Sequence, residues 1–135
     1  MKEFIKIGKL NRKMLNKLGI DIVTDDVIFT FERIEHVKSK RILLYDEVKN
    51  ILPIAIYSPD YIYKDWNNRD NTYIFIKDLY KNTKMNIAIK MSEENDNKHP
   101  KNSIITVIKI GEKTFNKIYR NKMEKILFQK LDKIE

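Results

Sequence analysis

The chain has 135 residues, enough for one domain over 1–135, and its hydrophobic share of 42% supports a packed core, which excludes a fully disordered chain. It contains no cysteine, which excludes a disulfide scaffold, a cysteine zinc site and a thiol nucleophile. The 27 Lys and Arg against 19 Asp and Glu give a net charge of +8, and no apolar run reaches the roughly 18 residues of a membrane span, so we expect a cytoplasmic protein with no membrane contact.

The N-terminal part of the chain predicts short elements. Residues 4–10 favour an extended segment, and Asn11 is a suitable N-cap for a brief helix that Gly19 would end. Residues 20–30 hold two short apolar pieces around a Thr-Asp-Asp turn signal, which favours a small hairpin or an irregular extended pair.

A longer helix is predicted over 31–40, with Thr30 as its N-cap. Phe31, Ile34 and either Val37 or Lys38 follow the spacing of a buried helix face.

The sequence around Pro53 predicts a break between two segments. A helix capped by Asp46 is expected over 45–52 and would be interrupted by Pro53. Residues 54–57 are apolar throughout and are expected to be buried, either as helix or as strand.

Strand patterns dominate the rest of the chain. Runs rich in β-branched, aromatic or alternating apolar residues, separated by polar turns, predict four strands at 61–63, 72–80, 86–91 and 103–110. A polar loop is expected at 92–102, a helix at 112–121 and a closing strand at 124–131. Helices followed by consecutive strands predict an α+β fold with an antiparallel meander.

Basic charge is concentrated at the two ends of the sequence. Residues 1–20 carry six basic and one acidic side chains (+5), and residues 98–135 carry ten and four (+6), which leaves −3 for residues 21–97 of the total of +8. If the two ends meet in space, they form a patch suited to a phosphate backbone. AT-rich coding, which favours Lys, would give the same excess without selection for binding.

Few kinds of chemistry fit the residues present. No Gly-rich phosphate loop, Gly-x-Ser-x-Gly or His-Glu-x-x-His motif occurs, and two histidines cannot supply a multi-histidine metal site, so we expect no cofactor and no metal. Metal-independent RNA cleavage needs only proton-transfer groups and cationic or hydroxyl groups on the phosphate, because the RNA's own 2′-hydroxyl is the nucleophile. Histidine suits the proton role, since imidazole takes both protonation states near neutral pH.

Four short motifs occur in order between about residues 20 and 131. They read Thr30-Phe31-Glu32-Arg33-Ile34-Glu35-His36-Val37, Ser58-Pro59-Asp60-Tyr61-Ile62, Asn102-Ser103-Ile104-Ile105-Thr106 and Lys125-Ile126-Leu127-Phe128-Gln129-Lys130. Together they resemble phage polyvalent-protein nuclease domains of the barnase–EndoU–colicin–RelE group. The resemblance implies N-terminal helices packed on a four-stranded antiparallel sheet, as in barnase and RelE, and RNA cleavage without metal by 2′-hydroxyl transphosphorylation.

The resemblance also implies roles for particular residues. His36 would transfer protons, Ser103 and Thr106 would contact the scissile phosphate, and Lys130 would be a further phosphate contact. The family's second histidine corresponds to Arg41, which can hold a phosphate but cannot accept a proton at ordinary pH. Ser103 and Thr106 stand three residues apart, so on a regular strand they lie on opposite faces unless a bulge or strand end intervenes.

Several other side chains are candidates for RNA contact. The basic ones are Arg33, Lys40, Arg120 and Lys125. The aromatic ones, which either stack on bases or pack in the core, are Tyr57, Tyr61, Tyr63 and Trp66. His36 shares its side of the predicted helix with Glu32, so it is either a proton-transfer group or an exposed histidine paired with that carboxylate.

These observations predict a metal-independent endoribonuclease, a toxin or phage or mobile-element effector of the bacterial cytoplasm, with RNA as substrate and an immunity protein as a partner. Arg41 in place of a second histidine favours an alternative, a catalytically inactive mobile-element protein that occupies RNA or inhibits a host nucleoprotein defence complex such as an RNA-guided nuclease. A protein-interaction domain whose basicity reflects genome composition is the third interpretation.

Overall fold

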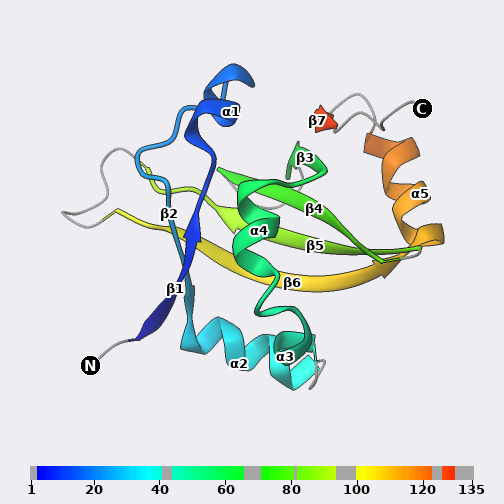
Figure 1. The fold of residues 1–135 in the computed structure, drawn as a ribbon, viewed down its shortest axis with the longest axis horizontal. Helices are drawn as coiled ribbons and strands as arrows, with labels where there is room; N and C mark the ends of the chain where they lie inside the picture. The colour runs from blue at the N-terminus through cyan, green and yellow to red at the C-terminus, as the bar shows by residue number, and fades with distance from the viewer. Residues whose placement is uncertain are drawn as a thin grey trace.

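The computed structural model describes residues 3–40, 44–65, 71–80, 82–93, 100–122 and 126–129. Within these ranges, one seven-stranded sheet and five helices form an α+β fold (Figure 1). The strands are β1 (Phe4–Lys9), β2 (Asp26–Thr30), β3 (Tyr61–Lys64), β4 (Thr72–Tyr80), β5 (Thr83–Lys90), β6 (Asn102–Gly111) and β7 (Ile126–Gln129). The helices are α1 (Arg12–Lys17), α2 (Phe31–Lys40), α3 (Leu44–Val48), α4 (Leu52–Tyr57) and α5 (Glu112–Lys122).

The expected four-stranded sheet under N-terminal helices is wrong. The strand order is β1-β2-β6-β5-β4-β3-β7, so the predicted meander of β3 to β6 forms only the middle of the sheet. β2 joins β6 in parallel, whereas β1 pairs with β2 and β7 pairs with β3 in antiparallel fashion. The strands outside this meander, β1, β2 and β7, are short. Apart from the β1–β2 pair, they pair with strands that are far away along the chain, and periodicity within one segment does not reveal such pairings.

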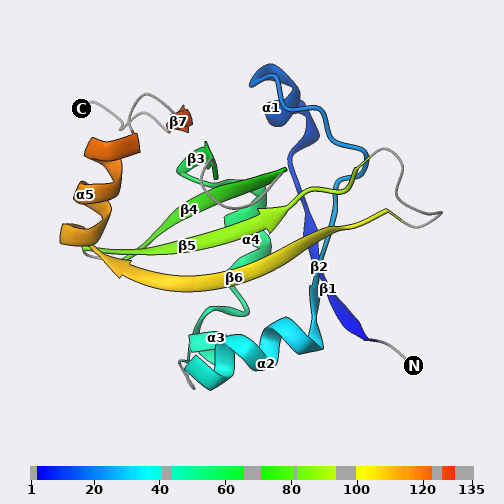
Figure 2. The ribbon, with the colours of Figure 1, turned by 180° about the vertical axis from the view of Figure 1, so that it is seen from behind.

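The two faces of the sheet carry separate cores, and helices cover both (Figures 1 and 2). Along β5, Ile87 and Ile89 belong to the larger core and Ala88 to the smaller one, as the alternation of a strand requires. The helices α1 to α4 contribute to the larger core through buried residues that include Leu15, Ile34, Val48 and Ile56. The last helix, α5, covers the smaller core with Phe115.

Two of the three predicted helix N-caps, Asn11 and Thr30, are confirmed, whereas Asp46 lies inside α3, which spans Leu44–Val48, and so is not its N-cap. The Asn11 side chain accepts a hydrogen bond from the Met14 N–H (3.1 Å), and the Thr30 hydroxyl accepts one from the Arg33 N–H (3.1 Å). Gly19 lies just past α1 with φ +81°, in the left-handed region that favours glycine. The hairpin expected within 20–30 is not formed, because only residues 26–30 are strand and they pair with β1 instead.

The helical predictions needed two further corrections. Ile34 and Val37 are buried as expected, but Phe31 is 45% exposed because it begins α2 at the edge of the core. Pro53 lies in the first turn of α4 rather than ending a helix. Proline is tolerated there because an N–H in the first turn has no hydrogen-bond partner within the helix. Residues 54–57 are therefore helical and only half of them are buried, namely Ala55 and Ile56.

Candidate functional site

The position of α2 beside β6 follows from the strand that precedes it. β2 pairs in parallel with the first residues of β6, at Val27 with Asn102 and Ile28 with Ser103. Helix α2 follows β2 with no intervening loop, so it continues alongside β6 in the same direction (Figures 1 and 2). Its buried face packs into the larger core, which leaves the side that carries His36 exposed.

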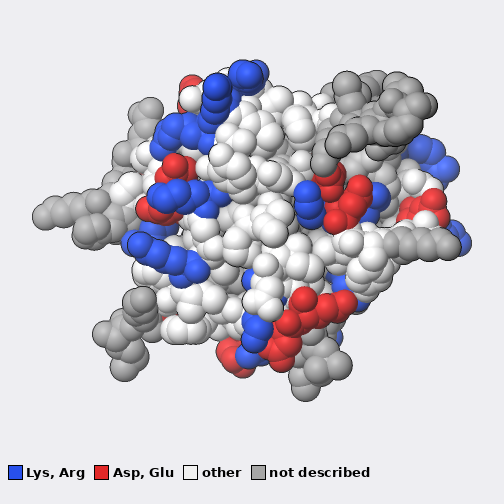
Figure 3. Space-filling model, viewed as in Figure 1, with Lys and Arg blue, Asp and Glu red and all other residues white. Residues whose placement is uncertain are grey.

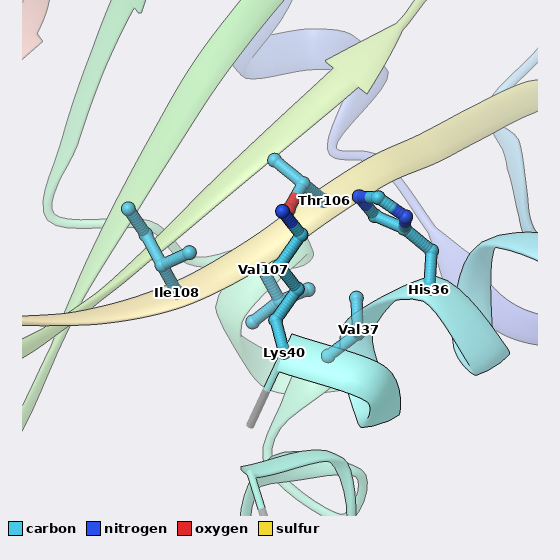
Figure 4. Close-up of a pocket in the computed structure, with 6 residues that line it drawn as sticks. All are labelled: His36, Val37, Lys40, Thr106, Val107 and Ile108. Carbon is cyan, nitrogen blue, oxygen red and sulfur yellow. The ribbon is translucent and has the colours of Figure 1, made fainter. Parts of the chain in front are cut away.

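A pocket of about 450 Å³ lies between α2 and β6 (Figure 4). Its lining residues are His36, Val37 and Lys40 of α2 and Thr106, Val107 and Ile108 of β6. The His36 and Lys40 side chains extend from the helix toward Thr106 on the strand (Figure 4). Three residues predicted to act on RNA thus line one pocket, although they lie up to 70 positions apart in the sequence.

The pocket is cationic. None of the described residues that line it is a carboxylate, and no ion pair joins Lys40 to a described residue. Both His36 and Glu32 are described, and no ion pair joins their side chains, so the alternative in which His36 merely pairs with Glu32 is not observed. An ammonium group, an imidazole and a hydroxyl facing one space suit an anionic ligand with several acceptor oxygens, such as a phosphate.

A β-bulge interrupts β6 next to this pocket. On the neighbouring strand β5, Ala88 pairs with Thr106. The next residue, Ile89, pairs with Ile104, so Ile105 is an extra residue on β6. Such a bulge bends the strand and re-aims the side chains beside it.

The bulge turns Ser103 and Thr106 to the same face of the sheet. Ser103 pairs with Lys90, which lies two residues beyond Ala88 on β5 and therefore shares its face. For this reason the two side chains do not lie on opposite faces, as was expected for a regular strand. Ser103 nevertheless lies outside the α2–β6 pocket and lines a second pocket where β5 ends and β6 begins.

Asn102 is a residue of this region that sequence reasoning missed. Its side chain is fully buried, accepts a hydrogen bond from the Ser92 N–H (2.9 Å) and donates to the carbonyl oxygens of Thr24 (2.8 Å) and Asp26 (3.0 Å). It therefore fastens the start of β6 to β2 and to the end of β5. An asparagine at the end of a polar loop is typical of a turn, and nothing in its spacing indicated this role.

The other predicted site residues lie elsewhere. Arg33 is exposed on α2, one turn before His36 on the same side of the helix. Arg120 is exposed on α5, which begins where β6 ends, and does not line the pocket. Arg41, Lys125 and Lys130 lie outside the described residues.

Two of the candidate aromatic residues belong to the core. Tyr63 is buried in the smaller core, and the ring centroid of Tyr61 lies 4.9 Å from that of Phe115. Tyr57 is 49% exposed on α4, and Trp66 lies outside the described residues. The core interpretation therefore holds for Tyr61 and Tyr63.

Basic residues on the face shown in Figure 3 lie in separate groups beside acidic ones. At the N-terminal end, the Lys9 ammonium donates to Asp26 (2.8 Å) and lies 3.4 Å from Asp25. The hydrogen bond from Lys9 is the main reason that the pKa of the Asp26 carboxyl is lowered. Among the described residues the two ends of the sequence do meet at β1, because the Lys101 ammonium lies 5.0 Å from the centroid of the Phe4 ring and acts with Lys6 and Lys9 on Asp26.

No protein-family model, curated protein or solved structure matches the chain. The resemblance to the barnase–EndoU–colicin–RelE group stays a prediction for that reason. Among the described residues, no three His, Asp or Glu side chains converge in a way that could hold a metal ion. None of the helices in the described part of the chain is long and apolar enough to cross a membrane.

Proposed function

We propose that the pocket between α2 and β6 binds a phosphate of RNA and that the protein cleaves the RNA there by transphosphorylation. The observation that carries this proposal is the shared pocket of His36, Lys40 and Thr106, which two separate elements supply. These groups match what the reaction needs, namely one group that exchanges a proton near neutral pH and donors for a charged phosphate.

In the proposed reaction, the His36 imidazole accepts the proton of the 2′-hydroxyl while that oxygen attacks the adjacent phosphorus. The bond from phosphorus to the 5′-oxygen breaks, the departing oxygen takes a proton from water, and a 2′,3′-cyclic phosphate remains. The Lys40 ammonium and the Thr106 hydroxyl donate to the non-bridging phosphate oxygens, where negative charge develops.

The direct test is cleavage of single-stranded RNA in the presence of EDTA. We expect His36→Ala and His36→Gln to lower the rate by about 100- to 10,000-fold, the usual contribution of a general acid–base group. Lys40→Ala is expected to lower it by about 100-fold, through loss of a charge-stabilising donor. Lys38→Ala is the matched control, because it removes the same charge from the same helix at a side chain that lies over the Tyr45 ring rather than in the pocket.

DNA of the same sequence lacks the 2′-hydroxyl and should not be cleaved. Full activity of both His36 variants, or equal cleavage of DNA, would refute the proposed reaction. The cellular role that we propose with it is that of a cytoplasmic toxin or mobile-element effector held in check by an immunity protein. Growth arrest on expression of the unmodified chain, relieved by His36→Ala, is the corresponding test.

RNA binding without turnover is the second candidate function. The observation that favours it is the single imidazole among the lining residues in the described part of the chain, since neither Lys40 nor Thr106 accepts a proton at ordinary pH. A protein of this kind would bind RNA with strong salt dependence and form no product. Stable co-purification with a host nucleoprotein complex would instead identify an inhibitor of such a complex.

A further inference from the structure

The second pocket, of about 210 Å³, lies where β5 ends and β6 begins. Its lining residues are Lys90, Met91, Ser92, Glu93, Lys101 and Ser103. Lys90 is exposed, Ser103 is half-buried, and the two pair directly across the strands. Among the described residues that line it, two lysines and one carboxylate, Glu93, give a net charge of +1.

The hydroxyl residues of the two pockets, Ser103 and Thr106, lie on the same face of the sheet. Ser103 in the second pocket pairs with Lys90, and Thr106 in the first pocket pairs with Ala88. Lys90 and Ala88 are two residues apart on β5, which places the paired positions about 7 Å apart along the strand. Two neighbouring phosphates of an extended nucleic-acid strand can therefore occupy two sites at this spacing. Without the extra residue in β6, a three-residue separation would have put Ser103 and Thr106 on opposite faces.

Helix α2 adds positive charge along the same line. Arg33 precedes His36 by three positions and Lys40 follows it by four, so all three side chains form one stripe on the helix. Glu32, four positions before His36, belongs to the same stripe, so Arg33, Lys40 and Glu32 together give it a net charge of +1. The helix runs beside β6 in the same direction (Figure 2). A strand of RNA that follows β6 would therefore have hydroxyl and ammonium groups of the sheet on one side and this stripe on the other.

We infer that the second pocket is a second phosphate site, which holds the phosphate next to the scissile one on the same RNA strand. Lys90 and Ser103 hold that neighbouring phosphate, while His36, Lys40 and Thr106 hold the scissile phosphate. The inference rests on the proposed function and gives Ser103 a role different from the scissile-phosphate contact that the resemblance implied. It makes the preferred substrate an oligonucleotide rather than a dinucleotide, because only a longer strand fills both pockets.

The experiment measures the cleavage of a short and of a long substrate by the unmodified protein and by the double variant Lys90→Ala, Ser103→Ala. In EDTA, cleavage of the dinucleotide UpU, which has one phosphate, is expected to be unchanged. Cleavage of hexauridylate is expected to lose about tenfold in kcat/KM, with the loss in KM, since the variant removes a binding contact away from the reacting phosphate. Lys113→Ala, which removes an exposed lysine from α5, is the matched control and should affect neither substrate.

A binding measurement covers the case of a protein without turnover. Hexauridylate with 2′-O-methyl groups has no free nucleophile and cannot be cleaved, so its affinity can be followed by fluorescence anisotropy at several salt concentrations. The double variant should bind it about tenfold more weakly, with the slope of log K against log salt reduced by about 0.7, the value for one phosphate contact on a single strand.

The possible results separate the inference from the proposed function. If the unmodified protein neither binds nor cleaves any RNA, the proposed function fails. If it acts on RNA but the double variant treats hexauridylate as the unmodified protein does, the second phosphate site is overturned and the proposed function stands. An equal loss on UpU and hexauridylate also overturns it, because Lys90 and Ser103 would then act on the scissile phosphate itself.

Discussion

Replacing Asn102 with alanine is expected to destabilise the fold and to disturb the α2–β6 pocket together. The substitution leaves the Ser92 N–H without its acceptor at a residue that is only 6% exposed, and an unsatisfied buried donor costs about 1–3 kcal/mol. It also removes two hydrogen bonds to the carbonyl oxygens of Thr24 and Asp26, each of which contributes about 0.5–1.5 kcal/mol. The free energy of unfolding should therefore fall by roughly 2–6 kcal/mol, within the range of buried hydrogen-bond networks.

Urea denaturation at neutral pH, followed by circular dichroism, measures this loss. Asn16→Ala is the control, because Asn16 is exposed on α1 and its replacement should change stability by less than about 0.5 kcal/mol. Where the Asn102→Ala variant remains folded, its RNA cleavage should also fall, because the hydrogen bonds that hold β2, and hence α2, in place beside β6 are lost. A loss of less than about 1 kcal/mol would refute the reasoning, because it would mean that water replaces all three bonds.

Asn102→Asp sharpens the test. A carboxylate still accepts the hydrogen bond from the Ser92 N–H, but it has no proton to donate to the two carbonyl oxygens. Burial and these oxygens raise the pKa of the introduced carboxyl in the folded state, so the folded state binds its proton more tightly than the unfolded state. The variant should therefore be closest to the unmodified protein in acid and lose stability as the pH rises through that pKa. Equal destabilisation by Asn102→Asp below and above the pKa of the introduced carboxyl would contradict the argument.

Two further predictions concern backbone conformation and alkaline pH. Gly19→Ala should cost about 1–2 kcal/mol through its positive φ alone, since a Cβ there meets nothing within 4 Å, whereas Gly111→Ala should stay within about 0.5 kcal/mol; urea denaturation of both variants checks the difference. Burial raises the pKa of Tyr63 in the folded state. Its phenol therefore contributes to the free energy of unfolding fully below about pH 10, and this contribution is lost as the pH rises through the folded-state pKa. Tyr63→Phe should therefore lose less stability than the unmodified protein between about pH 9 and pH 11, and an equal loss in both would show that Tyr63 is not involved.

The parts of the fold that depend on neighbouring residues could be predicted from the sequence. Asn11 and Thr30 were predicted to be helix caps because their side chains reach an N–H three residues ahead, and both do so. The strands β4 and β5 were predicted from their residue types and alternation, and they form a long antiparallel pair in the structure. In each case the information lies within about ten residues of sequence.

The remaining features depend on contacts between distant segments. The parallel pairing of β2 with β6 joins Val27 to Asn102, and no local pattern indicates it. The shared pocket of His36 and Thr106 depends on that pairing, so composition and spacing could nominate both residues but could not place them together. The burial of the Asn102 side chain has the same origin, because its partners come from β2 and the end of β5.

The bulge residue Ile105 allows the geometry of the site to be separated from the stability of the fold. Ile104 pairs with Ile89 and belongs to the larger core. The next paired residue, Thr106, faces Ala88 of the smaller core. Deleting Ile105 therefore joins two segments whose faces already alternate correctly, and every other β6 side chain keeps its face. The stability cost is the contact of one half-buried isoleucine with the smaller core, about 1 kcal/mol.

The deletion should nevertheless abolish most RNA cleavage. Without the bulge, β6 loses its local bend, and Thr106 shifts relative to His36, whose position is set by β2 and α2. Ile105→Ala is the matched control, because it removes the same contact while keeping the extra residue, and it should cleave RNA at the normal rate. Urea denaturation and the EDTA cleavage assay on both variants give the comparison. If the deletion variant cleaves as well as the unmodified protein, the bend in β6 does not position Thr106 for the reaction, whereas equal loss in Ile105→Ala would assign the effect to the isoleucine side chain.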